Sequence, residues 1–109
     1  MRRIFLVSEQ NIQHLSDDNF SEEIAKGTVL VDFFAEWCGP CRMLTPLLEK
    51  LAGKKKIKIV KVDTDRAPNV SAQFGVSSIP TLVLLKGGKE QKRHVGLLDE
   101  KGLETFIST

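Results

Sequence analysis

Short apolar runs typical of β-strands alternate along this chain with segments of helical periodicity. The expected strands cover residues 12–15, 29–35, 57–62, 81–85 and 91–95, and the expected helices cover residues 19–26, 42–52, 68–74 and 99–107. Because helical segments separate the first three strands, we expect those strands to be parallel neighbours joined by crossover connections. This alternation places the chain in the α/β class.

The last two expected strands are joined differently. Gly87 and Gly88 lie between two short runs, and a glycine pair in that place is typical of a β-hairpin turn. The last two helices carry start signals, since Pro68 falls in a first turn and Asp99 at an N-cap. We therefore predict a mixed five-stranded central sheet, with three parallel strands and a C-terminal antiparallel hairpin, flanked by four helices on both faces.

Length and charge narrow the range of functions. A chain of 109 residues has room for one domain. Its formal net charge is only +2 and charges of both signs are interspersed, so we expect no nucleic-acid or membrane-surface partner. No segment reaches the roughly 18 apolar residues of a membrane span, and residues 4–7 are too short for a signal peptide. We therefore expect a cytoplasmic protein.

The chain has two cysteines, Cys38 and Cys41, which lie where an apolar strand gives way to a helical pattern. Residues three apart share one face of a helix, so the two thiols can open and close a disulfide. Unpaired N–H groups and the helix dipole favour a thiolate at this position, and the thiolate is the form that attacks disulfides. In the cytoplasm a disulfide is expected to be transient and catalytic. The pattern predicts a redox enzyme.

A zinc site is the main alternative for the cysteine pair. Cys38 and Cys41 could form half of such a site, with His14 and His94 completing it. The two histidines, however, lie on expected strands at a spacing unlike that of zinc fingers. We therefore expect no metal ion.

Three strings of residues resemble the thioredoxin family in their order and spacing. They are Val31-Asp32-Phe33-Phe34-Ala35-Glu36-Trp37-Cys38-Gly39-Pro40-Cys41, Lys61-Val62-Asp63 and Gly75-Val76-Ser77-Ser78-Ile79-Pro80-Thr81. The resemblance extends from Ile12 to the C-terminus, so residues 1–11 would be an N-terminal extension of a single thioredoxin domain. Their apolar run, residues 4–7, could add to an edge strand, or the true start of the protein could lie further along the chain. Phe34 departs from the pattern, because many members carry a second tryptophan there.

The resemblance implies the thioredoxin fold and a protein-disulfide reductase. Such an enzyme reduces disulfides of client proteins with a Cys-Gly-Pro-Cys dithiol and is recharged by a flavin-containing thioredoxin reductase that uses NADPH. The reversible Cys38–Cys41 disulfide would be its redox group, with no bound cofactor. The implied partners are thioredoxin reductase and disulfide-containing clients, and we expect a monomer.

The cysteines and the residues between them have distinct expected roles. Cys38, at the mouth of the helix, should be the nucleophile, and Cys41, one turn inside and shielded, should be the resolving thiol. Gly39 would let the backbone approach a partner closely, and Pro40 would stiffen the loop without placing a charge between the thiols. Related oxidants carry a histidine in that middle position, so Pro40 favours a reductant.

Asp32 is an ionisable residue inside an apolar strand. We expect it to be buried beneath the dithiol, where loss of hydration raises the pKa of the carboxyl group. From the pattern alone, Asp32 could equally be hydrogen-bonded scaffold. The resemblance implies that it accepts the proton of Cys41, directly or through a water. Lys61 on the neighbouring strand could moderate the carboxylate, or could be an ordinary exposed lysine.

A substrate-docking surface is also implied by the resemblance. The Ile79–Pro80 bond would be cis, a minority form of X-Pro bonds, with Pro80 packed against the cysteines. An exposed apolar patch would then bind an extended segment of the client. Its expected members are Trp37, Gly39, Pro40, Ile79, Pro80 and Gly96.

Two other functions remain open. The thioredoxin fold can serve as a binding or assembly subunit whose thiols are not turned over, although Cys38, Cys41 and Asp32 together argue for catalysis. The chain could also be a disulfide oxidant or isomerase. An insulin-reduction assay separates the first alternative from a reductase, and a measured redox potential separates the second.

Overall fold

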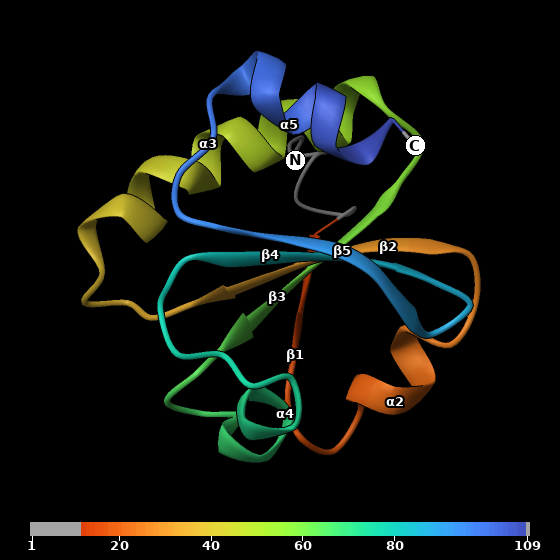
Figure 1. The fold of residues 1–109 in the computed structure, drawn as a ribbon, viewed down its shortest axis with the longest axis vertical. Helices are drawn as coiled ribbons and strands as arrows, with labels where there is room; N and C mark the ends of the chain where they lie inside the picture. Colours follow the sequence, from red (N-terminus) through yellow and green to blue (C-terminus); the bar gives the residue numbers. More distant parts are fainter. Residues whose placement is uncertain (1–11, 109) are drawn as a thin grey trace, which may run out of the picture.

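A computed structural model describes residues 12–108 of the chain. The elements, in chain order, are β1 (Ile12–Leu15), α2 (Phe20–Glu23), β2 (Thr28–Phe34), α3 (Gly39–Lys54), β3 (Lys58–Asp63), α4 (Pro68–Gln73), β4 (Thr81–Lys86), β5 (Lys89–Val95) and α5 (Glu100–Ile107). The expected extension, residues 1–11, lies outside the described residues. Figure 1 shows the helices on two sides of one sheet.

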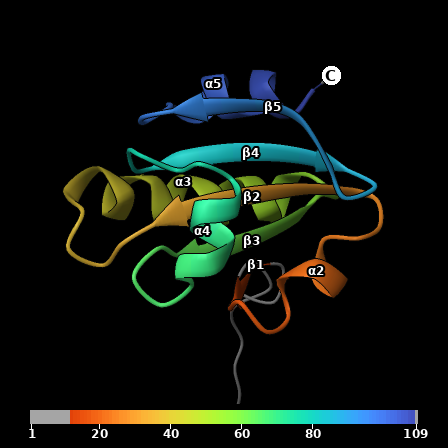
Figure 2. The same cartoon turned by 60° about the horizontal axis from the view of Figure 1, so that its bottom comes forward.

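The five strands form one mixed sheet in the order β1-β3-β2-β4-β5, which Figure 2 shows from β5 to β1. Strands β1, β2 and β3 are parallel, whereas β4 is antiparallel to β2 and β5 is antiparallel to β4. The predicted mixed sheet is therefore confirmed. The three parallel strands are neighbours, as expected, and they lie in the order β1-β3-β2, which the alternation of strands and helices did not specify. Crossover patterns predict strand direction, but packing across the whole sheet decides the pairing.

Each face of the sheet has its own hydrophobic core. Successive side chains of a strand point to opposite faces, so β2 contributes to both. Val29, Val31 and Phe33 pack in the cluster that includes residues of α2 and α4, whereas Leu30 packs with residues of α3 and α5. Asp32 shares the parity of Leu30 and therefore lies on the α3 side of the sheet.

Helix α3 is longer than expected and α2 is shorter. Helix α3 begins at Gly39, with Cys38 as its N-cap, because Pro40 falls in the first turn, where a missing N–H removes no hydrogen bond. Helix α2 ends at Glu23, three residues before the expected end, and the chain turns at Gly27 with a positive φ of 72°. Strand β5 begins at Lys89, two residues earlier than expected, and α3 ends at Lys54, two residues later than expected. The remaining observed ends differ from the expected ones by at most one residue.

Local turn and cap signals are confirmed. Gly87 and Gly88 both have positive φ values, 59° and 81°, in the turn between β4 and β5. The Asp99 carboxylate accepts a hydrogen bond from the Gly102 N–H at 2.8 Å and caps α5.

The cap of α4 comes from a distant part of the chain. Pro68 stands in the first turn as expected, but the N-cap residue, Ala67, offers no side-chain hydrogen bond. The Asp17 carboxylate instead accepts from the N–H groups of Asn69 and Val70, at 3.3 and 2.9 Å. Asp17 thus ties the β1–α2 loop to α4.

Candidate active site

The two cysteines lie at the N-terminus of α3, at the end of the sheet where β2 stops. Cys38 is the N-cap residue and its Sγ accepts a hydrogen bond from the Cys41 N–H at 3.2 Å. The Cα atoms are 5.2 Å apart and the two sulfurs are joined in a disulfide. In the reduced protein the same N–H group and the helix dipole would stabilise a thiolate on Cys38.

The two sulfurs differ in depth. Cys38 is 5% exposed and Cys41 is 1% exposed, and both pack in a small cluster with Phe34, Ala35 and Ile79. Gly39 and Pro40, between them in the chain, are exposed. The exposed residues of this segment are therefore Gly39 and Pro40, and Cys41 is the more buried of the two cysteines.

The loop before β4 brings a second part of the expected docking surface to the cysteines. The Ile79–Pro80 bond is cis, as predicted. The Ile79 carbonyl oxygen lies 3.9 Å from the Cys38 Sγ, and the Pro80 carbonyl accepts from the Gly96 N–H at 2.8 Å. Ile79 and Gly96 are half-buried and Pro80 is buried. The first contact places Ile79 next to Cys38, and the second ties Gly96 to Pro80, the residue that follows Ile79.

Trp37 is held by a residue that the sequence did not reveal. Its side chain is 69% exposed, yet its indole Nε1–H donates to the Asp65 Oδ2 at 2.9 Å. Asp65 lies in the loop between β3 and α4, and nothing in the local pattern distinguishes it from other surface aspartates. The hydrogen bond orients the one indole beside the nucleophile candidate.

Asp32 is a buried carboxyl group with unsatisfied oxygens. It is 0% exposed, and neither carboxyl oxygen has a hydrogen-bond partner among the residues that the structure describes. Loss of hydration raises the pKa of Asp32 to about 7, and the positive charge of Lys61 opposes that rise only in part. The prediction that Asp32 is buried is confirmed. Hydrogen-bonded scaffold does not describe this residue.

Lys61 lies beside Asp32 and is not an ordinary surface lysine. It pairs in register with Asp32 across β2 and β3, and only 6% of it is exposed. Its Nζ lies 3.9 Å from the Asp32 Oδ2, 4.5 Å from the centre of the Phe34 ring, and 2.7 Å from the Thr45 Oγ1. Of these three neighbours, the Thr45 hydroxyl accepts a hydrogen bond.

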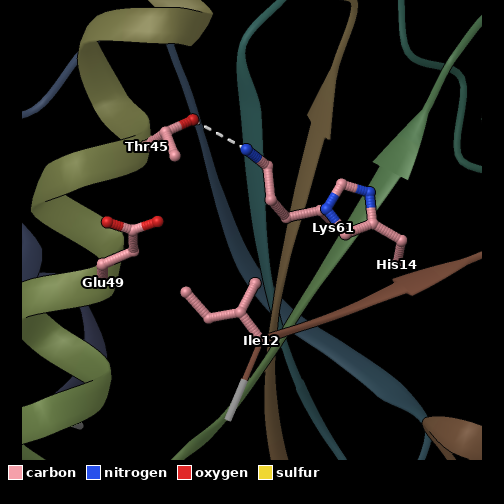
Figure 3. Close-up of a pocket in the computed structure, with 5 residues that line it drawn as sticks. All are labelled: Ile12, His14, Thr45, Glu49 and Lys61. Carbon is pink, nitrogen blue, oxygen red and sulfur yellow. Dashed lines mark hydrogen bonds between the residues drawn. The ribbon is translucent and has the colours of Figure 1, made fainter. Parts of the chain in front are cut away.

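Two pockets meet at Lys61 and Thr45. One, of about 280 Å³, lies between α3 and the β1 edge of the sheet (Figure 3) and is lined by Ile12, His14, Thr45, Glu49 and Lys61. The other, of about 300 Å³, is lined by Phe34, Ala35, Glu36, Cys41, Arg42, Thr45 and Lys61. Lys61, which lies beside the buried Asp32 carboxyl group, therefore also lines the pocket beside Cys41, together with Thr45.

The two histidines that a zinc site at the cysteine pair would need each pack against an aromatic ring. His14 packs edge-on against Phe34, and His94 packs against Phe106. Within residues 12–108, no three side chains of His, Cys, Asp or Glu gather as a metal site.

In the same part of the chain, no helix has the length and apolar character needed to cross a membrane.

Known proteins resemble this chain over most of its length. The family model described as Thioredoxin matches residues 11–109. Thioredoxin of Chlamydia muridarum is 58% identical over 98 residues, which is 89% of this chain and 96% of that protein, and thioredoxin of Rickettsia felis is 38% identical over 87% of this chain and 94% of that protein. The solved structure of a mutant thioredoxin from Halobacterium salinarum superposes with a TM-score of 0.78 at 37% identity, covering 88% of this chain and 87% of that chain. The chain belongs to the thioredoxin family and is a thiol–disulfide oxidoreductase.

Proposed function

We propose that this protein reduces client disulfides with Cys38 as nucleophile, Cys41 as resolving thiol and Asp32 as proton acceptor. One observation carries the assignment of Cys38. The first turn of α3 directs the Cys41 N–H at the Cys38 Sγ, at 3.2 Å, and so favours negative charge on that sulfur. Cys38 is also the less buried of the two cysteines.

The first exchange forms a mixed disulfide. The Cys38 thiolate attacks one sulfur of the client disulfide, whose S–S bond breaks as the Cys38–client bond forms. The other client sulfur leaves as a thiolate and takes a proton from solvent. The client segment is held by Trp37, Gly39, Pro40, Ile79, Pro80 and Gly96. Of these, the first three are exposed, Ile79 and Gly96 are half-buried, and Pro80 is buried.

The second exchange releases the client. Cys41 gives its proton to the Asp32 carboxylate and attacks the Cys38 Sγ, so that the mixed disulfide breaks and the Cys38–Cys41 disulfide forms. Two electrons pass to the client, which leaves with both of its sulfurs reduced. A carboxyl group with a pKa of about 7 can accept and release a proton near neutral pH, as a general base requires. Lys61 moderates that proton affinity through its charge.

The oxidised protein needs an external reductant. We infer that thioredoxin reductase supplies the two electrons from NADPH and that no cofactor is bound to this chain. A reducing compartment is where such a dithiol works as a reductant, so the cytoplasm is its proposed location. Pro40 between the thiols, in place of a charged residue, supports reduction over oxidation. We propose a monomer, because the docking surface must stay accessible to clients.

The test of the proposed function is coupled insulin reduction. The protein, a bacterial thioredoxin reductase and NADPH are mixed with insulin, and NADPH oxidation is followed together with precipitation of the insulin chains. We expect each molecule of the protein to support many cycles of NADPH oxidation and of insulin reduction. Equilibration with glutathione buffers should also give a potential more reducing than the glutathione pool. Absent turnover would favour a binding subunit, and a potential more oxidising than glutathione would favour an oxidant or isomerase.

Thiol asymmetry gives a direct test of the cysteine roles. In the reduced protein near pH 7, iodoacetamide is expected to modify Cys38 at least about tenfold faster than Cys41, because thiolate is favoured at the helix start and Cys41 is buried. Peptide mass spectrometry of quenched samples measures both rates. The matched control is the unfolded protein, in which the two cysteines should react alike. Faster labelling of Cys41 in the folded protein would reverse the assignment.

A further inference from the structure

The Lys61 ammonium group donates a hydrogen bond to a residue of α3 rather than to the Asp32 carboxylate beside it. Its Nζ donates to the Thr45 Oγ1 at 2.7 Å, whereas the Asp32 Oδ2 is 3.9 Å away, beyond hydrogen-bond distance. The Phe34 ring, 4.5 Å from the Nζ, bounds the ammonium on another side. Figure 3 shows Lys61 reaching across the pocket from β3 to Thr45 on α3.

The Thr45 hydroxyl is itself held in place by the active-site helix. Its Oγ1 donates to the Cys41 carbonyl oxygen at 3.3 Å, one turn earlier in α3. A hydroxyl group has one donor and two acceptor lone pairs, so this bond leaves the lone pairs free to accept from Lys61. Thr45 therefore links Lys61 to the backbone of the resolving cysteine.

The other charged groups near Lys61 come from several elements. His14 on β1 and Glu49 on α3 line the pocket in Figure 3, while Glu36 and Arg42 line the neighbouring pocket. Burial, and then the charge of Lys61, lower the pKa of His14. On β4, the residue paired with Asp32 is the apolar Leu82. Lys61 is thus the positive group within ion-pair distance of Asp32. Its position decides how far its charge lowers the pKa of Asp32.

We propose that the Thr45 hydroxyl is a positioning group that holds the Lys61 ammonium on α3 and so leaves the Asp32 carboxylate without a hydrogen bond from Lys61, free to accept the Cys41 proton. A charge-assisted hydrogen bond from Lys61 would favour the ionised carboxylate and make it a weaker base. The inference rests on the proposed role of Asp32. It adds a residue on the helix of the cysteines that sets the strength of the base.

The test compares Thr45→Val, which keeps the shape and loses the hydroxyl, with Thr45→Ser, which keeps the hydroxyl and loses a methyl group. In reduced full-length protein, carbon-13 NMR of the aspartate carboxyl groups follows the titration of Asp32. We expect the Asp32 midpoint to fall by about one pH unit in Thr45→Val, as Lys61 turns to the carboxylate, and to stay unchanged in Thr45→Ser. Thr45→Ala should behave as Thr45→Val does and serves if valine disturbs the helix.

Kinetics and a second background complete the test. Release of a client from its mixed disulfide should slow roughly three- to tenfold in Thr45→Val, because the weaker base removes the Cys41 proton less readily. In a Lys61→Met background, adding Thr45→Val should move the Asp32 midpoint no further, because no ammonium is present to turn. If Thr45 only supported the fold, Thr45→Val would change the Asp32 midpoint equally with and without Lys61.

The outcomes that overturn the inference are distinct. An unchanged midpoint in Thr45→Val would show that the hydroxyl does not position Lys61, and a raised midpoint would show that the ammonium turns to Glu49 instead. An equal shift in Thr45→Ser or in the Lys61→Met background would also overturn it. Failure of the proposed function looks different: Asp32→Asn would then release clients at the normal rate, whatever Thr45→Val does to the titration.

Discussion

Replacing Cys41 with serine is expected to lower steady-state insulin reduction at least about 1,000-fold, since the enzyme then has no thiol to resolve its mixed disulfide. The variant should instead accumulate a stable one-to-one adduct with a disulfide substrate. Non-reducing electrophoresis and intact-mass measurement detect this adduct directly. The same variant, used on a cell extract, should capture the client proteins.

Cys38→Ser is the matched control, because it makes the same exchange of sulfur for oxygen at the other cysteine. We expect it to be equally inactive and to form no adduct. Both variants should be compared with the reduced wild-type protein, so that the loss of the Cys38–Cys41 disulfide does not enter the comparison. An adduct on Cys38→Ser together with none on Cys41→Ser would assign nucleophilic attack to Cys41.

Asp32→Ala is expected to raise stability at pH 7 while it slows catalysis. The pKa of Asp32 rises from 3.8 to about 7 on folding, so the folded state holds its proton more tightly than the unfolded state. The stability that this binding contributes is present in full below pH 3.8 and is lost as the pH rises through about 7. At and above neutral pH the carboxyl group therefore costs the folded state about 4 kcal/mol.

Alanine removes that cost but leaves a small void and fewer contacts. We expect a net gain of roughly 1–4 kcal/mol in the free energy of unfolding at pH 7, which shrinks toward pH 4. Guanidinium unfolding at both pH values measures this change. Asp32→Asn is the matched control: it keeps the size and polarity of the side chain, cannot ionise, and should abolish the same pH dependence.

The catalytic half of the prediction uses single-turnover kinetics. Both Asp32 variants should form the mixed disulfide at the normal rate and resolve it more slowly, because Cys41 has lost its proton acceptor. Rapid-quench sampling of a disulfide substrate separates the two steps. A variant that is less stable at pH 7 and resolves normally would make Asp32 an ordinary structural residue.

Several features followed from short stretches of sequence. The cysteine spacing and the strand-to-helix transition located the dithiol at the start of α3, and Asp99 and the Gly87–Gly88 pair marked a cap and a turn that the structure confirms. These features depend on backbone preferences and on neighbours within one turn, which a local pattern contains. The roles proposed for the residues required the family resemblance as well.

The sequence by itself determined the elements, their directions and the reactive pair, and the tertiary structure decided what surrounds them. Only the fold shows that β3 separates β1 from β2, that Asp65 holds Trp37, and that Lys61 bonds to Thr45 rather than to Asp32. Such contacts join residues that are far apart in the chain. Their geometry results from packing of the whole sheet and its helices, so no local pattern of residues encodes it.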